Sequence, residues 1–215
     1  GKSVLLKCIL GLENPDIGNI IIDDISLSNI NASKRELINK RMGMLFQYGA
    51  LFDSLNVWEN IAFGLIQGQG VAKHIARDIA VERLSDVGLG ADVINLYPVE
   101  LSGGMRKRVA LARAIATKPD ILFFDEPTTG LDPIMGHVID DLIVKVVQKM
   151  GATVLTITHD MASAKRISNK IAMIYQGKIL WSGLTNQIDH SGHPHVEQFI
   201  NGNIKGPIQM AVRKD

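Results

Sequence analysis

"ILFFDEPTTGLD", residues 121–132, is the stretch of sequence that decides the fold. Four apolar residues lead directly into Asp125 and Glu126, the pattern of a short strand that is buried in a parallel sheet and ends in two carboxylates. In open α/β sheets, ligands bind at the carboxyl ends of the strands. Asp125 is therefore placed to hold Mg²⁺, and Glu126 to deprotonate an attacking water, although two solvated acids at a strand-to-turn junction would show the same pattern.

The rest of the chain alternates between strand-like and helix-like segments, which predicts an α/β layer architecture. We expect strands at 19–23, 42–46, 120–126, 153–158, 170–175 and 178–183, and helices at 4–10, 56–64, 71–87, 103–117, 134–150 and 161–167. From Asp189 on, the chain is richer in Gly, Pro and His and is expected to form an appended tail. The tail histidines match no standard zinc spacing.

Composition narrows the class of protein. The chain has 215 residues, of which 46% are hydrophobic, enough for one substantial core. A formal net charge of +1 gives no reason to expect a nucleic-acid partner. Cys8 is the only cysteine, so no internal disulfide forms, and a reducing compartment is expected. The apolar runs are shorter than the roughly 20 residues that span a bilayer, so any membrane role is expected to come through a partner.

A second motif, "LSGGMRKRVALARAIA" (101–116), precedes the Asp-Glu strand. Ser102, Gly103 and Gly104 come just before or at the start of a predicted helix, where backbone N–H groups and the helix dipole attract an anion. A Gly-rich helix cap without a ligand is the alternative. The order of this helix and the Asp-Glu strand favours the anion site.

Three further segments end at positions where a nucleotide could be held. Gln47 closes the strand "MGMLFQ", and His159 closes "TVLTITHD", where it could donate a hydrogen bond to a γ-phosphate. Gly1-Lys2-Ser3 matches the end of the phosphate-binding loop G-x-x-x-x-G-K-S and leads into a helix.

Together, these motifs resemble those of the nucleotide-binding domain of ATP-binding-cassette (ABC) transporters, in the same order and over essentially the whole chain. Gly1-Lys2-Ser3 is similar to the end of Walker A, Gln47 to the Q-loop, and Asp125-Glu126 to Walker B with its catalytic glutamate. Leu131-Asp132 is similar to the D-loop and His159 to the switch histidine. The signature motif is matched by Leu101, Ser102, Gly103, Gly104 and Met105.

The resemblance implies a P-loop NTPase fold: a mostly parallel sheet flanked by helices, a small antiparallel β part, and a helical subdomain that carries the signature. The ATP-binding domain would cover 1–188, with the helical subdomain at about 48–118 and the tail at 189–215. ATP and Mg²⁺ are the implied cofactors. Gly1, Lys2, Ser3, Val4 and Asp125 would bind ATP.

The resemblance also implies a role for each remaining motif. Ser3, Gln47 and Asp125 would hold Mg²⁺, while Glu126, His159 and Gln47 would be catalytic. The signature residues would bind the ATP of the other subunit in a head-to-tail homodimer, which ATP closes and hydrolysis opens.

Two departures from the common pattern narrow the subfamily. Met105 stands where most ABC proteins have Gln, and Val4 where a hydroxyl residue is common. The stretches that contain these two residues, together with "FQYGALFDSLNVWENIAF" (46–63) and the tail, resemble the sequences of Mla/Mkl-type ATPases. These work with an MlaE-like permease and an MCE-domain protein in phospholipid transport. The implied location is cytoplasmic, on the inner-membrane face, attached through the permease. Phe52, Leu55 and Trp58 are candidates for the groove that receives the permease.

Alternatives remain at this stage. The ATPase of an amino-acid or other small-solute importer would carry nearly the same motifs. A soluble ABC ATPase of DNA maintenance would need a long coiled coil, but only about a hundred residues separate Walker A from the signature. A translation-type protein would carry two cassettes. Because Walker A is present only from Gly1, we also expect the chain to be part of a longer protein and to bind ATP weakly by itself.

Overall fold

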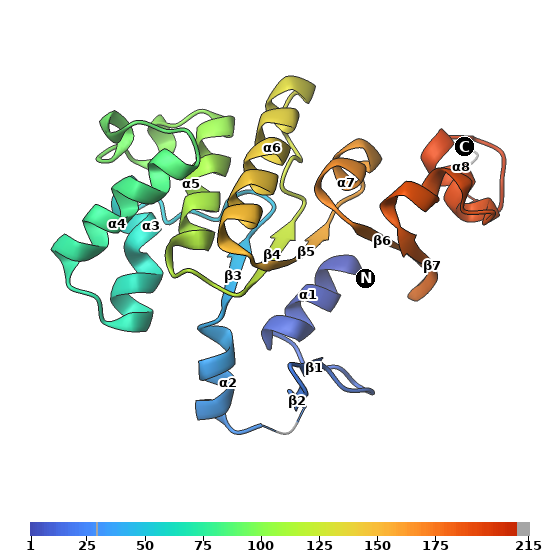
Figure 1. The fold of residues 1–215 in the computed structure, drawn as a ribbon, viewed down its shortest axis with the longest axis horizontal. Coiled ribbons are helices and arrows are strands. Elements are labelled where there is room, and N and C mark those ends of the chain that lie inside the picture. Colours follow the sequence, from blue (N-terminus) through green and yellow to red (C-terminus); the bar gives the residue numbers. More distant parts are fainter. Residues whose placement is uncertain (29, 210–215) are drawn as a thin grey trace, which may run out of the picture.

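The computed structural model describes residues 1–28 and 30–209, and its centre is a three-stranded parallel sheet (Figure 1). The strands are β3 (Met42–Leu45), β4 (Ile121–Asp125) and β5 (Thr153–Ile157), in the order β3-β4-β5. Leu45 pairs with Phe124, and Asp125 pairs with Ile157. Because the strands are parallel, their carboxyl ends meet at one edge of the sheet.

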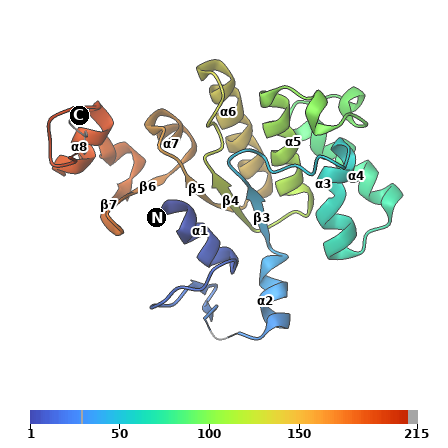
Figure 2. The ribbon, with the colours of Figure 1, turned by 180° about the vertical axis from the view of Figure 1, so that it is seen from behind.

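The two faces of the sheet belong to two separate clusters of apolar side chains, because successive residues of a strand point to opposite faces. Leu122 and Phe124 belong to the larger cluster, with α5 (Gly103–Ala116) and α6 (Pro133–Met150). Phe123 belongs to the smaller cluster, with Leu6 of α1 (Lys2–Leu10). Figure 2, in which the molecule is seen from behind, shows α1 and α6 on opposite sides of the sheet. The continuous apolar run of β4 is thus explained by burial on both faces.

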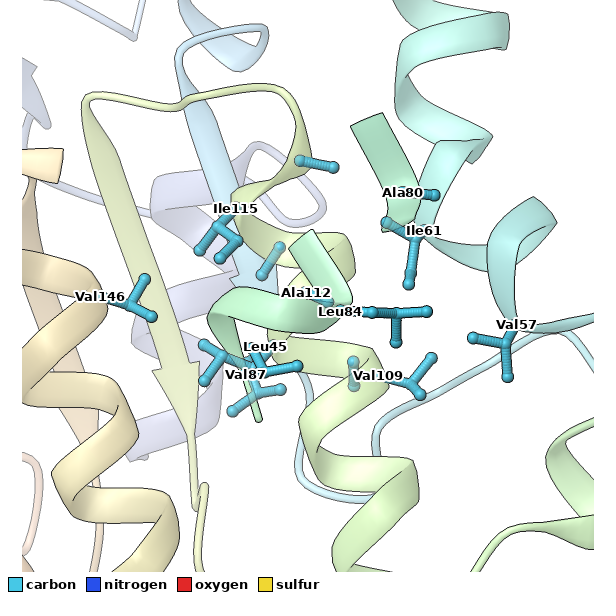
Figure 3. Close-up of a cluster of buried hydrophobic side chains, with 14 of the residues drawn as sticks. Leu45, Val57, Ile61, Ala80, Leu84, Val87, Val109, Ala112, Ile115 and Val146 are labelled. Atoms are coloured by element: carbon cyan, nitrogen blue, oxygen red, sulfur yellow. The ribbon is translucent and has the colours of Figure 1, made fainter. Parts of the chain in front are cut away.

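A helical region packs beside the sheet and shares the larger cluster. It consists of α3 (Val57–Phe63), the π-helical turn η1 (Gly64–Gly68), α4 (Lys73–Asp86) and α5. Figure 3 shows Ile61 of α3, Leu84 of α4 and Val109 of α5 meeting in this cluster. These helices lie inside the range 48–118 predicted for a helical subdomain; the domain boundaries themselves stay a prediction.

Two short antiparallel hairpins complete the β structure. β1 (Ile21–Ile22) pairs with β2 (Ile25–Ser26) across Asp23 and Asp24, and both turn residues have positive φ. β6 (Lys170–Tyr175) pairs with β7 (Lys178–Leu184) across Gln176 and Gly177, again with positive φ at both positions. Two-residue turns of this kind match the twist of the strands that they join.

The remaining elements are α2 (Ala32–Asn39), α7 (Met161–Ile167), α8 (Pro194–Asn201) and three short 3₁₀ helices, η2 (Ala91–Val93), η3 (Pro98–Glu100) and η4 (Thr185–His190). The predicted bounds of α7 are confirmed. The strand predicted at 19–23 is wrong in extent, because the chain turns at Asp23. The prediction missed β2, α2 and α8. In α2 only Ile38 is buried, so that helix has too little apolar periodicity to be read from sequence.

Candidate active site

Glu126 lies at the carboxyl edge of the sheet, one residue beyond β4, and is only 8% exposed. Its backbone is left-handed, with a φ of 50°, a conformation that residues with a β-carbon rarely adopt. The Glu126 N–H donates to the Ile157 carbonyl at 2.8 Å, so the end of β5 helps to hold this conformation. Non-glycine residues in this region of backbone conformation cluster at functional sites.

Three side chains surround the Glu126 carboxylate. His159 Nδ1 lies 2.8 Å from Oε2, and the Thr129 hydroxyl donates to the same oxygen at 3.1 Å. Lys2 Nζ lies 3.8 Å from Oε1. The structure therefore brings together the predicted residues Lys2, Glu126 and His159, and adds Thr129, which the sequence analysis missed. The one sequence feature that could have indicated Thr129 is its position three residues after Glu126, the spacing of a tight turn.

These contacts keep Glu126 ionised. Burial raises the pKa of Glu126, but the hydrogen bonds from His159 and Thr129 and the charge of His159 outweigh it, so the net pKa lies below the ordinary value. Because the carboxylate only accepts hydrogen bonds, the shared proton sits on His159 Nδ1. Nε2 is then the ring nitrogen of this exposed imidazole that is left for a hydrogen bond to another group.

Ser3 and Asp125 supply oxygen ligands suited to Mg²⁺. The Ser3 hydroxyl lies 3.5 Å from Asp125 Oδ1, with Ser3 in the first turn of α1 and Asp125 at the end of β4. Mg²⁺ usually takes one or two protein oxygens and completes its shell with water and phosphate. Within residues 1–28 and 30–209 no group of three His, Cys, Asp or Glu side chains that could hold a metal ion is found. Two protein oxygens, as Ser3 and Asp125 provide, are the number that a Mg²⁺ ion with water and phosphate ligands needs. No side chain caps the start of α1, at Gly1, and Val4 is exposed beside it.

Gln47 follows β3 by two residues, at the same edge of the sheet, and is half-buried. Two cations of α5 hold its segment through main-chain carbonyls. Lys107 Nζ contacts the Gln47 carbonyl, and Arg113 donates to Gly49 and Ala50 at 2.6 and 2.7 Å. Neither cation has a role that its sequence position indicates, since both lie in the interior of a predicted helix and far along the chain from Gln47.

The residues predicted to form the signature surround the start of α5. The Ser102 hydroxyl accepts from the Met105 N–H at 3.2 Å and so caps the helix, while Leu101 and Gly104 are buried. A β-carbon on Gly104 would lie 2.5 Å from Met135 Cε, so the end of the Met135 side chain, in α6, would have to move to admit one. Gly103 is exposed, and Met105 packs against the larger core cluster.

The predicted D-loop residues lie between β4 and α6. Asp132 caps α6 and accepts from the N–H groups of Ile134 and Met135, both at 3.0 Å. Leu131 is half-buried against the larger cluster. Among the described residues, no hydrogen bond or ion pair joins segment 101–105 to Lys2 or Ser3, so the chain alone does not bring these two predicted sites together.

A sequence model described as "ABC transporter" matches residues 1–129, more than half of the chain. This chain belongs to the ABC transporter family. The ABC chain is 40% identical over its whole length to the "Probable ribonucleotide transport ATP-binding protein mkl" of Mycobacterium tuberculosis (strain H37Rv), and spans 60% of that protein. The resemblance predicted from the motifs is confirmed, as is the similarity to Mla- and Mkl-type ATPases.

Other relatives of this ABC chain support the same conclusion. It is 39% identical over 98% of its length to the "Intermembrane phospholipid transport system ATP-binding protein MlaF" of Haemophilus influenzae, covering 79% of that protein. Among solved structures, it aligns with the dimeric ATP-binding cassette MJ0796 bound to ADP and Pi. That alignment has a TM-score of 0.77 and 31% identity, and covers 86% of this chain and 81% of the other. The predicted fold class is thus confirmed.

Proposed function

We propose that this chain binds and hydrolyses ATP as the nucleotide-binding part of an ABC transporter. The observation that carries the proposal is the buried Glu126 carboxylate, ionised and oriented by His159 and Thr129 at the carboxyl edge of the sheet. An ionised carboxylate near the predicted phosphate site is suited to accept a proton from water that attacks the γ-phosphate.

Each neighbouring residue has a distinct task in this proposal. Lys2 binds phosphate oxygens with its ammonium group, and its 3.8 Å separation from Glu126 is loose enough to be replaced by phosphate. Ser3 and Asp125 would hold Mg²⁺, with Gln47 as a further oxygen donor; the ion supplies positive charge that offsets the charge of the phosphates. His159 keeps the Glu126 carboxylate oriented through Nδ1 and offers its other ring nitrogen to the phosphate.

The Glu126→Gln variant of the full-length protein tests the proposal. The amide has nearly the same shape as the carboxylate but cannot accept the proton, so we expect the turnover of ATP to fall by about 10²–10⁴-fold while ATP binding remains. Glu36→Gln is the matched control, because Glu36 is an exposed glutamate of α2 whose one ion pair among residues 1–28 and 30–209 is with Lys40. Wild-type turnover in Glu126→Gln would disprove the role of Glu126.

A head-to-tail homodimer completes the site in this proposal. Segment 101–105 has no polar contact with Lys2 or Ser3 within the described chain, whereas exposed Ser102 and Gly103 at a helix start are suited to bind the phosphate of a second subunit's ATP. The dimeric form of the MJ0796 cassette, aligned at 31% identity, supports this arrangement. The measurement is the ATP-dependent change in mass of Glu126→Gln by light scattering; a mass that stays monomeric with ATP would refute the dimer.

We propose phospholipid, or another hydrophobic molecule, as the cargo, moved with an MlaE-like permease and an MCE-domain protein. The names of the MlaF relatives and of "Protein TRIGALACTOSYLDIACYLGLYCEROL 3, chloroplastic" of Arabidopsis thaliana, 39% identical over 97% of this chain, support lipid transport. A small-solute importer is the second candidate. The "Histidine/lysine/arginine/ornithine transport ATP-binding protein HisP" of Salmonella typhimurium, 36% identical over 95% of this chain, favours it.

Lipid analysis of separated membranes from a depleted strain distinguishes the two cargoes. A changed phospholipid distribution supports lipid transport, and lost amino-acid uptake with normal lipids supports the importer. In the part of the chain that the structure describes, no helix is long and apolar enough to cross a membrane. We propose that the chain reaches the cytoplasmic face of the inner membrane through its permease.

The segment after Gln47 is the proposed permease-binding surface. Phe52 and Phe63, which are 42% and 38% exposed, lie with their ring centroids 4.6 Å apart. Of the residues predicted for this surface, Phe52 is exposed, Leu55 is half-buried, and Trp58 packs against the core. Phe52→Asp should therefore abolish co-purification with the permease, whereas Leu37→Asp, at an exposed position of α2, should not. Equal co-purification of both variants would exclude this surface.

A further inference from the structure

Lys107 is a buried cation with an unusual place in the fold. It lies in the second turn of α5 and is only 5% exposed, although lysine is almost never buried without a partner. Burial lowers the pKa of Lys107 to about 8, against the charges of Glu126 and Asp125, which raise it. The negative charges of these two residues at the end of β4 stabilise its ammonium form.

The contacts of Lys107 join three parts of the chain. Its ammonium group donates to the carbonyl of Glu126 at 3.2 Å and also contacts the carbonyl of Gln47. The two carbonyls follow neighbouring parallel strands, β4 and β3, whose ends form the candidate active site. Lys107 therefore bonds the main chain, and not the side chain, of two residues that are predicted to handle water and Mg²⁺.

The contact with Glu126 is at the point where the backbone is left-handed. The Glu126 N–H is already bound to Ile157, at 2.8 Å, and the Lys107 ammonium binds the other side of the same residue through its carbonyl. A backbone in a disfavoured conformation persists only when its surroundings hold it. The Glu126 carbonyl also accepts from the Thr129 N–H, at 3.3 Å. Loss of the Lys107 donor would leave it with this longer hydrogen bond inside the turn, so the backbone of Glu126 would be held less firmly to α5 and the carboxylate would move with it.

We propose that Lys107 is a positioning residue for ATP hydrolysis: it fixes the backbone of Glu126 and Gln47 to the helix that starts with the signature segment. This inference rests on the proposed function. Because Ser102, Gly103 and Gly104 lie within five residues of Lys107, the proposed nucleotide-binding start of α5 and the donor that holds the Glu126 main chain are joined by one helix. Lys107, in the second turn of α5, thus links the start of this helix to the candidate catalytic edge of the sheet.

The test measures steady-state ATP hydrolysis and nucleotide affinity in the full-length protein, purified with its permease. Lys107→Met keeps the length and apolar stem of the side chain but removes the donor. We expect kcat to fall at least tenfold. The Kd for ATP and the KM should stay within twofold, since Lys2 and the signature residues that are proposed to bind phosphate are unchanged. Lys107→Arg restores a cationic donor and should recover at least a third of the wild-type kcat.

Arg108→Met is the matched control, because Arg108 also donates from α5 to a carbonyl, that of Gly88 at 3.2 Å, outside the candidate active site. Its kcat should stay within twofold of wild type. A wild-type kcat in Lys107→Met, or a Lys107→Met loss that Arg108→Met reproduces, would overturn the proposal. If Lys107→Met does not fold, Lys107→Gln decides: a kcat at least fivefold lower at unchanged affinity supports the proposal, and a wild-type kcat overturns it. Full activity in Glu126→Gln would instead refute the proposed function.

Discussion

Replacement of Gly43 by alanine should damage the fold at the strand that leads to Gln47. Gly43 is buried in β3, beneath the last turn of α5. A β-carbon there would lie 2.2 Å from the Ala114 carbonyl oxygen, 2.8 Å from Leu122 Cδ2 and 2.9 Å from Pro119 Cγ. The closest atom belongs to the backbone, so no side-chain rotation relieves the clash, and α5 must move away from the sheet by roughly 1 Å in a close-packed interior.

The magnitude follows from the usual cost of overpacking. Extra methyl groups in a well-packed core cost about 1–3 kcal/mol, and the backbone clash places Gly43→Ala at about 3 kcal/mol. For a chain of this size, one kcal/mol corresponds to about 2–4 °C in Tm, so we expect a decrease of roughly 6–12 °C. Movement of α5 would also displace Lys107, so ATP turnover should decrease together with stability.

Urea unfolding followed by circular dichroism, together with calorimetry, measures the change in the full-length protein. The midpoint should decrease at an unchanged m-value, the signature of a pure stability effect. Gly68→Ala is the control: Gly68 is exposed in η1, and among the described residues no heavy atom lies within 4 Å of a β-carbon built there. It should stay within about 0.5 kcal/mol of wild type. An equally small effect of Gly43→Ala would refute the packing argument.

Two further predictions concern a helix cap and a buried acid. Asn56→Ala removes the cap of α3, where the Asn56 side chain accepts from the Glu59 N–H at 3.1 Å and the Glu59 side chain accepts from the Asn56 N–H at 3.0 Å. The free energy of unfolding should decrease by about 1 kcal/mol, and an unchanged urea midpoint would contradict this. Burial raises the pKa of Asp140, which is 1% exposed, despite the hydrogen bond from Ser163 and the charge of Arg166. Because the folded-state pKa lies above the unfolded one, stability present at low pH is lost as the pH rises through it. As the pH rises above about 4, the free energy of unfolding of the wild type should therefore fall relative to that of Asp140→Asn, whose amide does not ionise. Curves of unfolding free energy against pH that run parallel for the two proteins would exclude this.

Much of the fold follows from local patterns in the sequence. The apolar run of β4 predicted a strand of the kind that is buried in a parallel sheet, and the helices predicted at 103–117 and 134–150 agree with α5 and α6 to within one residue at each end. Elements with few buried residues, such as α2, escaped the prediction because they leave no apolar period to read. Their position is set by contacts such as the hydrogen bond from Arg35 to the Ile9 carbonyl.

The sequence by itself also predicted which residues meet at the candidate active site. Gly1-Lys2-Ser3, Asp125-Glu126 and His159 each follow or precede a regular element, so their order along the chain places them at one edge of a parallel sheet. The structure brings Lys2, Glu126 and His159 into contact there. Local sequence is sufficient for this because each residue is fixed by its own strand or helix.

Only the tertiary structure decided how these residues are held. Lys107 reaches Gln47 across 60 positions of sequence and Glu126 across 19, and neither contact has a local pattern. The buried Asn60 likewise binds the carbonyls of Phe52, Leu55 and Asn56, and so shapes the segment after Gln47. The left-handed backbone of Glu126 is disfavoured by its own side chain. It exists because Ile157 of β5 and Lys107 of α5 bind its main chain in the folded protein, while His159, which follows β5, binds its carboxylate.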